Sequence, residues 1–449
     1  QPQTTLNGAS GSGWDPTLRV VGGVTDATAI VASADWLCAR GGDGVRCWGQ
    51  VPPPYIVPTP PRTAAAVIAG SANVTHFDPG DYHLCGVNLS GSVQCWGSNN
   101  TGQIDPLSVT GSDGSGLVPT VRDAVGVAAG ERHTCVLTRM GDVYCLGSNQ
   151  YGQLGALPLP VQRTPVQHPT LREVSSLSAG YGSACAVFRD GSVSCWGANA
   201  EGGLGDGTRT RRTSPVRVLG LAGPVASVVP GSQHTCARLV DQTVQCWGWN
   251  SRAQLGDGTF TSRLSPTFVP GLRDVVEIGA GWDFTCARSV GGAVRCWGYN
   301  YYGQLGSGTS GAERTAPVTV TGLPPADQLA VSYSSSCARA GGRVWCWGVG
   351  TGGQLGDGLS MSSAVPVAVS GVTSAVDISV GGGAACAVLA DGSVQCWGGG
   401  ASLRSALPFS LPGITNALRV SAGTERICAL LRDRRDDADL PDVSHRHAL

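Results

Sequence analysis

The most prominent reactive side chains of this sequence are cysteines that occur in pairs. Sixteen of its 17 cysteines form pairs nine or ten residues apart. A turn sequence separates the two members, such as Arg189-Asp190-Gly191 in a ten-residue pair and Gly42-Asp43 in a nine-residue pair. With a three-residue and a two-residue loop respectively, both spacings place the cysteines directly opposite each other in an antiparallel hairpin, at a Cα separation of roughly 4.5 Å. That separation lies within disulfide range. The predicted bonds are Cys38–Cys47, Cys85–Cys95, Cys135–Cys145, Cys185–Cys195, Cys236–Cys246, Cys286–Cys296, Cys337–Cys346 and Cys386–Cys396.

The cysteines could serve two other purposes, as zinc ligands or as free thiols. Zinc sites usually take two cysteines only two to four residues apart, and a facing pair would leave the remaining ligands unsupplied. The alternative that stays open is that the cysteines are free and serve as small buried hydrophobes. Disulfides at this density indicate an oxidising compartment, so the expected location is extracellular or at the cell surface. Cys428 is left over and is a candidate for an intermolecular bond or a free thiol.

Other reactive residues do not assemble into a catalytic or metal-binding set. His83, His133 and His234 share one register, two residues before a cysteine, which places them in separate repeats as structural hydrogen-bonding groups. Asp206, Asp257 and similar aspartates precede glycines, where turn formation explains them better than calcium binding. The sequence therefore predicts no enzyme activity, no metal and no cofactor.

The elements that position the cysteines repeat with a period of 48 to 51 residues. Eight segments read Val-x-Cys-Trp-Gly, with Leu146 in place of Trp in one of them. Each repeat has four strand-like segments separated by turns and no helical periodicity, which predicts an all-β protein of four-stranded propeller blades. We expect a flexible lead-in over 1–13, one propeller over 14–432 and a charged, disordered tail over 433–449.

The number of blades is open in the sequence. Residues 417–433 look like the first two strands of a ninth repeat, with Cys428 in its second strand, but no ninth Val-x-Cys-Trp-Gly follows. Eight blades closed by strands from both termini, or nine blades with one incomplete, fit this pattern. Seven blades would leave material over.

The repeat "HTC…V-x-C-W-G-x-N-x-x-G-Q-L-G-D-G-T" resembles that of the regulator of chromosome condensation, and the resemblance extends from about residue 14 to 432. It implies a β-propeller. Members of this superfamily include an exchange factor for a small GTPase, a plant ultraviolet-B receptor and a secreted inhibitory protein, so the resemblance does not choose a function. The receptor's signature is matched only in part, by Gly281 to Thr285, which argues against light reception.

Charge and composition exclude some partners. The net charge is −1, and all 30 basic residues are arginines that form no stripe suited to nucleic acid. No uninterrupted apolar stretch is long enough to span a membrane. Exposed aromatic residues in the loops after the Cys-Trp-Gly segments indicate a partner site at Trp249, Tyr299, Tyr301 and Tyr302. The alternative is that these rings pack between blades.

Three Asn-x-Ser/Thr motifs, at Asn73, Asn88 and Asn99, are possible glycosylation sites. Together these features predict a secreted, non-enzymatic propeller that binds a protein or glycan through one face. The alternative is a structural subunit that self-assembles into an extracellular structure through its termini and its incomplete last repeat.

Overall fold

The computed structural model describes residues 74–398 apart from 80–82, 98, 105–113, 119, 131, 156–158, 181, 232 and 382. It also describes the strand segments 29–32, 36–41, 44–49, 66–67, 405–410, 417–422 and 427–431. These residues contain strands and turns but no helix. The predicted lead-in over 1–13 and tail over 433–449 lie outside the described residues.

The strands form eight four-stranded antiparallel sheets and one two-stranded sheet. We call them blades 1 to 9 in chain order. Blades 1 to 4 comprise β1 (Ala29–Ala32), β2 (Trp36–Gly41), β3 (Gly44–Gly49), β4 (Ala66–Val67); β5 (Val74–Pro79), β6 (His83–Asn88), β7 (Val93–Gly97), β8 (Gly114–Leu117); β9 (Ala124–Ala129), β10 (His133–Thr138), β11 (Val143–Ser148), β12 (Val161–Gln167); and β13 (Val174–Ala179), β14 (Ser183–Phe188), β15 (Val193–Gly197), β16 (Arg212–Arg217).

The remaining blades repeat this order. Blades 5 to 9 comprise β17 (Val225–Pro230), β18 (His234–Leu239), β19 (Val244–Gly248), β20 (Arg263–Phe268); β21 (Val275–Ala280), β22 (Phe284–Ser289), β23 (Val294–Gly298), β24 (Arg314–Thr319); β25 (Gln328–Val331), β26 (Ser335–Ala340), β27 (Arg343–Gly348), β28 (Ser363–Ala368); β29 (Ala375–Val380), β30 (Ala384–Leu389), β31 (Val394–Gly398), β32 (Ser405–Ser410); and β33 (Ala417–Ala422), β34 (Ile427–Leu431).

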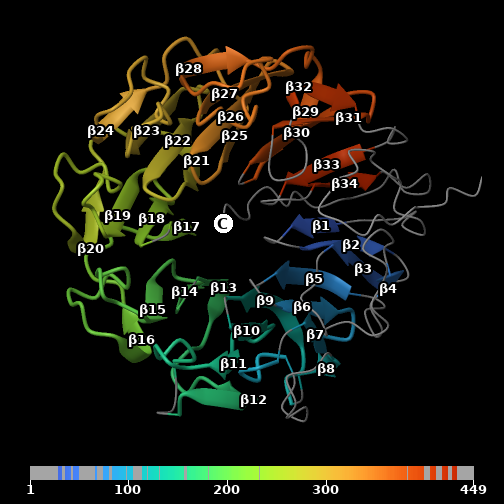
Figure 1. Cartoon of the computed structure of the whole chain (residues 1–449). Coiled ribbons are helices and arrows are strands. Elements are labelled where there is room, and N and C mark those ends of the chain that lie inside the picture. Colours follow the sequence, from blue (N-terminus) through green and yellow to red (C-terminus); the bar gives the residue numbers. More distant parts are fainter. Residues whose placement is uncertain are drawn as a thin grey trace, which may run out of the picture.

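The sheets stand around a ring, with the first strand of each blade innermost and the fourth outermost (Figure 1). Blade 9 occupies the gap between blades 8 and 1, since β33 packs against β29 and β30 while β1 contacts β33 and β34. A carboxylate of blade 8 joins this contact, because Asp377 Oδ2 accepts a hydrogen bond of 2.8 Å from the backbone N–H of Val420. The ring therefore has eight four-stranded blades and a ninth with two described strands.

The hairpin between the second and third strands has the register that the cysteine spacing predicts. In each of the first eight blades the two cysteines are direct cross-strand partners, as for Cys286 and Cys296. Seven of these pairs, in blades 2 to 8, are disulfides with Cα separations of 4.0–4.2 Å. Cys38 and Cys47 face each other in the same register, but their side chains lie outside the described residues, as does that of Cys428.

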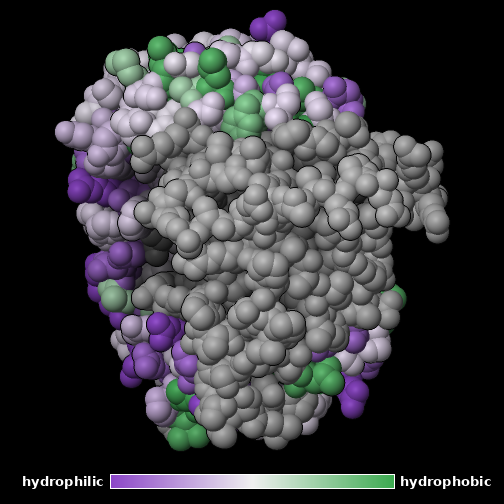
Figure 2. All heavy atoms as spheres, turned by 45° about the vertical axis from the view of Figure 1, so that its right-hand side comes forward, coloured by the Kyte–Doolittle hydropathy of each residue, from purple (hydrophilic) through white to green (hydrophobic). Residues whose placement is uncertain are grey.

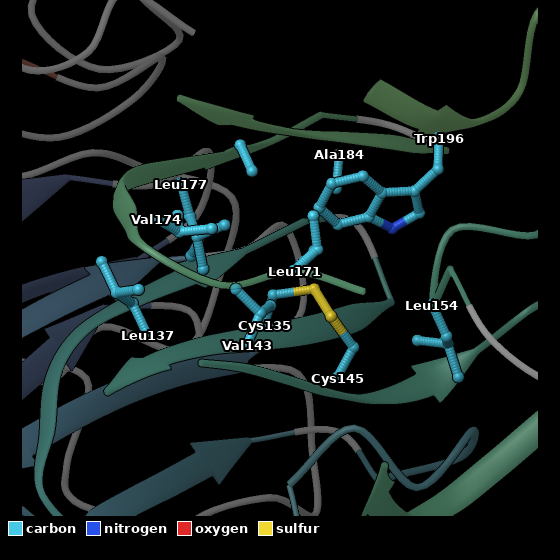
Figure 3. Packing of buried hydrophobic residues seen from close by; sticks show 12 residues of the cluster. Cys135, Leu137, Val143, Cys145, Leu154, Leu171, Val174, Leu177, Ala184 and Trp196 are labelled. Atoms are coloured by element: carbon cyan, nitrogen blue, oxygen red, sulfur yellow. A yellow bond between two sulfur atoms is a disulfide. The ribbon is translucent and has the colours of Figure 1, made fainter. Parts of the chain in front are cut away.

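The hydrophobic core lies between blades rather than within them. The disulfide Cys135–Cys145 of blade 3 packs with Leu171 against Trp196 of blade 4, and the side chains of both cysteines and Trp196 are fully buried (Figure 3). Because residues alternate between the two faces of a strand, Val193 and Cys195 face one neighbouring blade and Trp196 faces the other. This sandwich explains why both faces of each third strand are apolar.

Tryptophans of the third strands join blades 4 to 8 to the blade before each of them. The indole N–H of Trp297 in blade 6 donates to the backbone carbonyl of Gln254 in blade 5 at 2.9 Å. Trp196, Trp247, Trp347 and Trp397 make the equivalent bond at 2.7–3.1 Å. Gly256 makes room for the ring, because a Cβ there would lie 2.6 Å from Cδ1 of Trp297. The loop that carries the Gln-Leu-Gly sequence in one repeat thus binds the tryptophan of the next repeat.

Candidate partner-binding surface on blades 5 to 7

The loops of each blade are divided between two faces of the ring. Since the four strands run alternately up and down, the connections from first to second and from third to fourth strand lie on one face, which we call the loop face. The disulfide hairpins and the connections between blades lie on the other, the hairpin face. Residues of two separate connections in each repeat therefore meet on the loop face.

The loop after the third strand is held rigidly by its own polar side chains. In blade 6, Asn300 Oδ1 accepts the backbone N–H of Leu305 at 3.1 Å, and Gln304 Oε1 accepts that of Tyr302 at 3.0 Å. Both polar side chains are buried, as is Leu305. With its polar and leucine side chains turned inward, the loop presents Tyr301 and Tyr302 to solvent, 60 % and 44 % exposed.

Five rings gather on the loop face of blades 6 and 7, and we call them the aromatic surface: Trp282, Tyr299, Tyr301, Tyr302 and Tyr333. Tyr299 and Tyr301 are stacked with centroids 6.4 Å apart, and Tyr302 meets Tyr301 edge-on at 5.1 Å. Trp282 contacts Tyr333 of blade 7 edge-on at 5.8 Å. The two groups are linked through the backbone, because the N–H of Tyr299 donates to the carbonyl of Asp283 at 2.9 Å.

Three of the four residues predicted for the partner site belong to this surface. Trp249, the counterpart of Tyr299 in blade 5, is half-buried and makes no ring contact of this kind among the described residues. Trp282 and Tyr333 were not predicted, because they come from the connection between the first and second strands. The sequence did contain a signal for them, because the antiparallel order of the strands places the first-to-second-strand connection on the same face as the tyrosine loop.

Charged groups flank the rings. Arg252 of blade 5 lies over the Tyr299 ring, with Cζ 5.2 Å from its centroid, and its Nη1 is 3.1 Å from Oε1 of Glu313. Burial raises the pKa of the Asp283 carboxyl, and the nearby Arg252 charge opposes that rise only partly. Oδ1 of Asp283 is buried without a hydrogen-bond partner among the described residues.

Comparison with known proteins places this geometry in a family. The family model described as RCC1-like domain matches residues 56–338, and the model of the regulator of chromosome condensation (RCC1) repeat matches residues 341–388. The chain belongs to the RCC1-like domain family. A search of curated proteins gave no match for this RCC1-like chain.

Solved structures share the fold at low identity. Human WBSCR16 is 22 % identical with a TM-score of 0.56, and the match covers 76 % of the RCC1-like chain and 98 % of that chain. Yeast RCC1 (Prp20), solved bound to Kap60, is 21 % identical with a TM-score of 0.56 over 76 % and 89 % of the two chains. A second yeast structure, Prp20p from Saccharomyces cerevisiae, is 20 % identical with a TM-score of 0.53 over 77 % and 87 %. These similarities show the propeller fold alone.

The three histidines singled out in the sequence lie buried in the RCC1-like ring. Burial lowers the pKa of His83 to about 3, with the neighbouring His133 adding to the shift, and lowers those of His133 and His234 to about 4. His83 and His234 each meet a threonine hydroxyl of the next blade, at 2.7 and 3.0 Å. For His133, the equivalent position in the next blade is Ala184, which has no hydroxyl. Neither ring nitrogen of His133 has a hydrogen-bond partner among the described residues.

The aspartates that precede glycines organise the loops. Asp257 accepts hydrogen bonds from Asn250 at 3.1 Å and from Arg263 at 2.6 Å. Burial alone would raise the pKa of Asp257, but the hydrogen bonds from Arg263 and Thr259 outweigh burial and lower it. Asp206 has the same arrangement with Asn199 and Arg212. Within the described residues no group of three or more His, Cys, Asp or Glu side chains is placed to hold a metal ion.

Two of the three predicted glycosylation motifs can be placed. Asn99 is 1 % exposed and its Oδ1 accepts the backbone N–H of Ile104 at 3.1 Å, so its place in the loop leaves no room for a glycan and that prediction is withdrawn. Asn88 is half-buried and its Oδ1 accepts the N–H groups of Ser90 and Ser92 in a hairpin turn. Asn73 lies outside the described residues. The described part of the chain has no helix with the length and apolarity that crossing a membrane requires.

Proposed function

We propose that this RCC1-like propeller is a secreted, non-enzymatic binding protein that holds a protein or glycan partner on its aromatic surface. The observation that carries the proposal is the exposure of Trp282. Its ring is 59 % exposed, whereas the five tryptophans that join blades 4 to 8 to the preceding blade are fully buried. Exposed aromatic rings on a rigid scaffold are the usual anchors of binding interfaces.

The flanking repeats add apolar area to the same face. Phe260, Leu359 and Met361 lie in the third-to-fourth-strand loops of blades 5 and 7 and are 53 %, 57 % and 67 % exposed. Figure 2 shows green, hydrophobic residues mixed with pale and purple ones along the upper margin of the molecule, the side that holds blades 6 to 8 in Figure 1. Aromatic residues and methionine are enriched in protein interfaces.

Secretion and protein binding rest on further observations. Seven disulfides in successive blades favour an oxidising compartment. The printed descriptions of two yeast structures with this fold name protein partners: one is RCC1 (Prp20) bound to Kap60, and the other concerns binding of Prp20p to Gsp1p and histones. A propeller of this family is therefore a suitable support for a protein-binding face.

The test is capture of a partner from the extracellular fraction of the native source, together with a glycan array. The variant Trp282→Ala/Tyr301→Ala removes two exposed rings from the aromatic surface. The matched control, Leu89→Ala/Met140→Ala, removes two side chains that are each 75 % exposed on the hairpin face. Loss of a specific partner in the first variant and its retention in the control support the proposal. Equal binding by both variants contradicts it.

A second candidate is the structural subunit of an extracellular assembly. The observation that favours it is blade 9, in which the structure describes two strands where it describes four in every other sheet. An incomplete sheet offers strand edges to which another chain can add a strand. Light scattering over a concentration series distinguishes the candidates, because a monomer at high concentration argues against assembly.

A further inference from the structure

The side chain of Asp283 is the one group of the aromatic surface whose bonding requirements the described residues do not meet. Asp283 follows Trp282 in the connection between β21 and β22, and its backbone carbonyl fixes Tyr299. Its Oδ1 is shielded from water and accepts no hydrogen bond from the described residues. A carboxylate oxygen in that position is costly unless a donor or a cation satisfies it.

The cation that acts on the carboxyl of Asp283, Arg252, is already engaged. Arg252 is close enough to influence Asp283, but it lies over the ring of Tyr299 and forms an ion pair with Glu313 at 3.1 Å. Its backbone N–H is also used, in a hydrogen bond of 2.9 Å to Gln254 Oε1. The surface thus holds one paired carboxylate, Glu313, and one, Asp283, that has a buried oxygen without a donor.

The rings of the aromatic surface have the chemistry to accept a second cation. The contact between Arg252 and Tyr299 shows that a guanidinium binds to a ring face within this cluster. Tyr301 offers a more exposed ring stacked beside Tyr299, and Trp282 stands next to the carboxylate in sequence. Tryptophan and tyrosine faces attract guanidinium groups, and a neighbouring carboxylate reinforces that attraction.

We propose that the aromatic surface receives an arginine side chain of a protein partner, with its guanidinium against the exposed rings and its charge compensated by Asp283. This inference rests on the proposed function and names the chemistry of its partner. A protein is favoured over a glycan because the surface offers a negative charge without a matching free cation. Phe260, Leu359 and Met361, which are exposed in loops of the same face in blades 5 and 7, add apolar area that a protein segment can contact.

The first test uses the full chain and a blocked peptide, acetyl-Gly-Arg-Gly-amide, followed through the indole N–H resonance of Trp282 by NMR. The control peptide replaces arginine with citrulline, which has the same shape without the charge. The arginine peptide is expected to shift the Trp282 resonance and to bind about tenfold more tightly than the citrulline peptide. Equal binding of the two peptides, or a shift only with an oligosaccharide such as maltotriose, overturns the inference.

The second test is Asp283→Asn, which keeps the shape of the side chain and removes its charge. It is expected to weaken binding of the arginine peptide about tenfold. Asp241→Asn changes an exposed aspartate of the hairpin face and is expected to leave binding unaltered. An unchanged melting temperature shows that each variant is folded. If Asp283→Asn binds the peptide as the wild type does, the inference is wrong.

The native partner separates this inference from the broader function. If capture is lost in Trp282→Ala/Tyr301→Ala but persists fully in Asp283→Asn, the surface binds a partner and the assignment of an arginine fails. If capture persists in both variants, the proposed function itself fails. If both variants lose capture while the hairpin-face control retains it, both proposals are supported.

Discussion

The indole N–H of Trp297 donates to the backbone carbonyl of Gln254 in the preceding blade at 2.9 Å, with the whole ring buried between the two blades. The same carbonyl accepts the hydroxyl of Thr285 at 3.1 Å. One peptide group of the Gln-Leu-Gly loop therefore holds two neighbouring strands of the next blade.

Replacing Trp297 with phenylalanine is expected to destabilise the protein by about 1–3 kcal/mol, through loss of the indole hydrogen bond and a partly filled cavity. Unfolding in guanidinium chloride measures the effect. The matched control is Trp282→Phe at the exposed tryptophan, for which we expect a change within about 0.5 kcal/mol. Similar losses at the two sites would show that burial between blades is not what stabilises the ring.

Replacing Gly256 with alanine tests whether the Trp297 ring needs the space that a glycine leaves in this loop. Its φ is 68°, and the added Cβ would meet the buried Trp297 ring at 2.6 Å. Gly258→Ala is the control, since Gly258 has a φ of 87° and no atom within 4 Å of the added Cβ. Backbone strain should cost about 1–2 kcal/mol at both positions, and the clash about 1–3 kcal/mol more at Gly256. Equal costs would argue against a steric role for Gly256.

The buried histidines predict loss of stability in acid. The folded pKa values of His83, His133 and His234, about 3 to 4, lie below the ordinary value of 6.5. Between pH 6.5 and 4 these histidines are therefore protonated in the unfolded chain but stay neutral in the folded ring. Above pH 6.5 the three histidines cause no loss of the free energy of unfolding. As the pH falls from 6.5 toward the folded pKa, each of them lowers that free energy by about 1.4 kcal/mol per pH unit.

The variant His133→Phe isolates one histidine from the aspartates that also titrate in acid. Blade 6 carries Phe284 at this register, fully buried, so the ring accommodates a phenyl group there. The variant removes two unpartnered nitrogens and is expected to reduce the pH slope of the unfolding free energy between pH 6 and 4.5 by about 1.4 kcal/mol per unit. An unchanged slope would show that His133 does not resist protonation.

The disulfides predict a defined pattern of thiol reactivity. Seven cysteine pairs are bonded, and Cys38 faces Cys47 in the same register. Intact mass after alkylation without reduction should show 16 protected cysteines of the 17 in the chain, or all 17 if Cys428 is linked to another molecule. Alkylation of most cysteines before reduction would contradict both the bonds and the proposed secretion.

Breaking a single bond measures its energetic contribution. In the variant Cys286→Ala/Cys296→Ala, loss of a ten-residue closed loop is expected to cost about 2.5–3 kcal/mol. Chemical unfolding of this variant against the reduced and oxidised wild type gives the comparison. A cost near zero would indicate that the inter-blade packing alone determines the hairpin.

The strands and the cysteine register were predictable because they depend on local spacing, whereas the number of blades stayed open because it depends on how the two ends of the chain meet. A ten-residue separation with a three-residue turn and a nine-residue separation with a two-residue turn each have one antiparallel solution, which Cys185–Cys195 and Cys337–Cys346 respectively adopt. The bond from each tryptophan to the preceding blade could not be read in the same way, because it joins positions 43 or 44 residues apart.

The candidate site was predictable only in part for a related reason. Tyr299, Tyr301 and Tyr302 lie in one loop, so the sequence places them together. Trp282 and Tyr333 contact each other from two other connections, in blades 6 and 7, which join the tyrosine loop through the backbone bond from Tyr299 to Asp283. Asn99 is a prediction that failed for the opposite reason. Its sequence motif is that of a glycosylation site, but its side chain is buried within the loop. Local patterns identify what a residue can do, whereas neighbouring blades determine whether it is free to do it.

The tryptophan bonds also give the ring a direction. Each donor lies in the later blade and each acceptor in the earlier one, so a lesion in a Gln-Leu-Gly loop weakens the attachment of the blade that follows, not of the blade that precedes. Blade 3 has Leu146 at this position and lacks an indole donor toward blade 2. Among the six junctions from blade 2 to blade 8, that of blades 2 and 3 therefore lacks the indole bond, and hydrogen exchange should show it opening more readily than the other five.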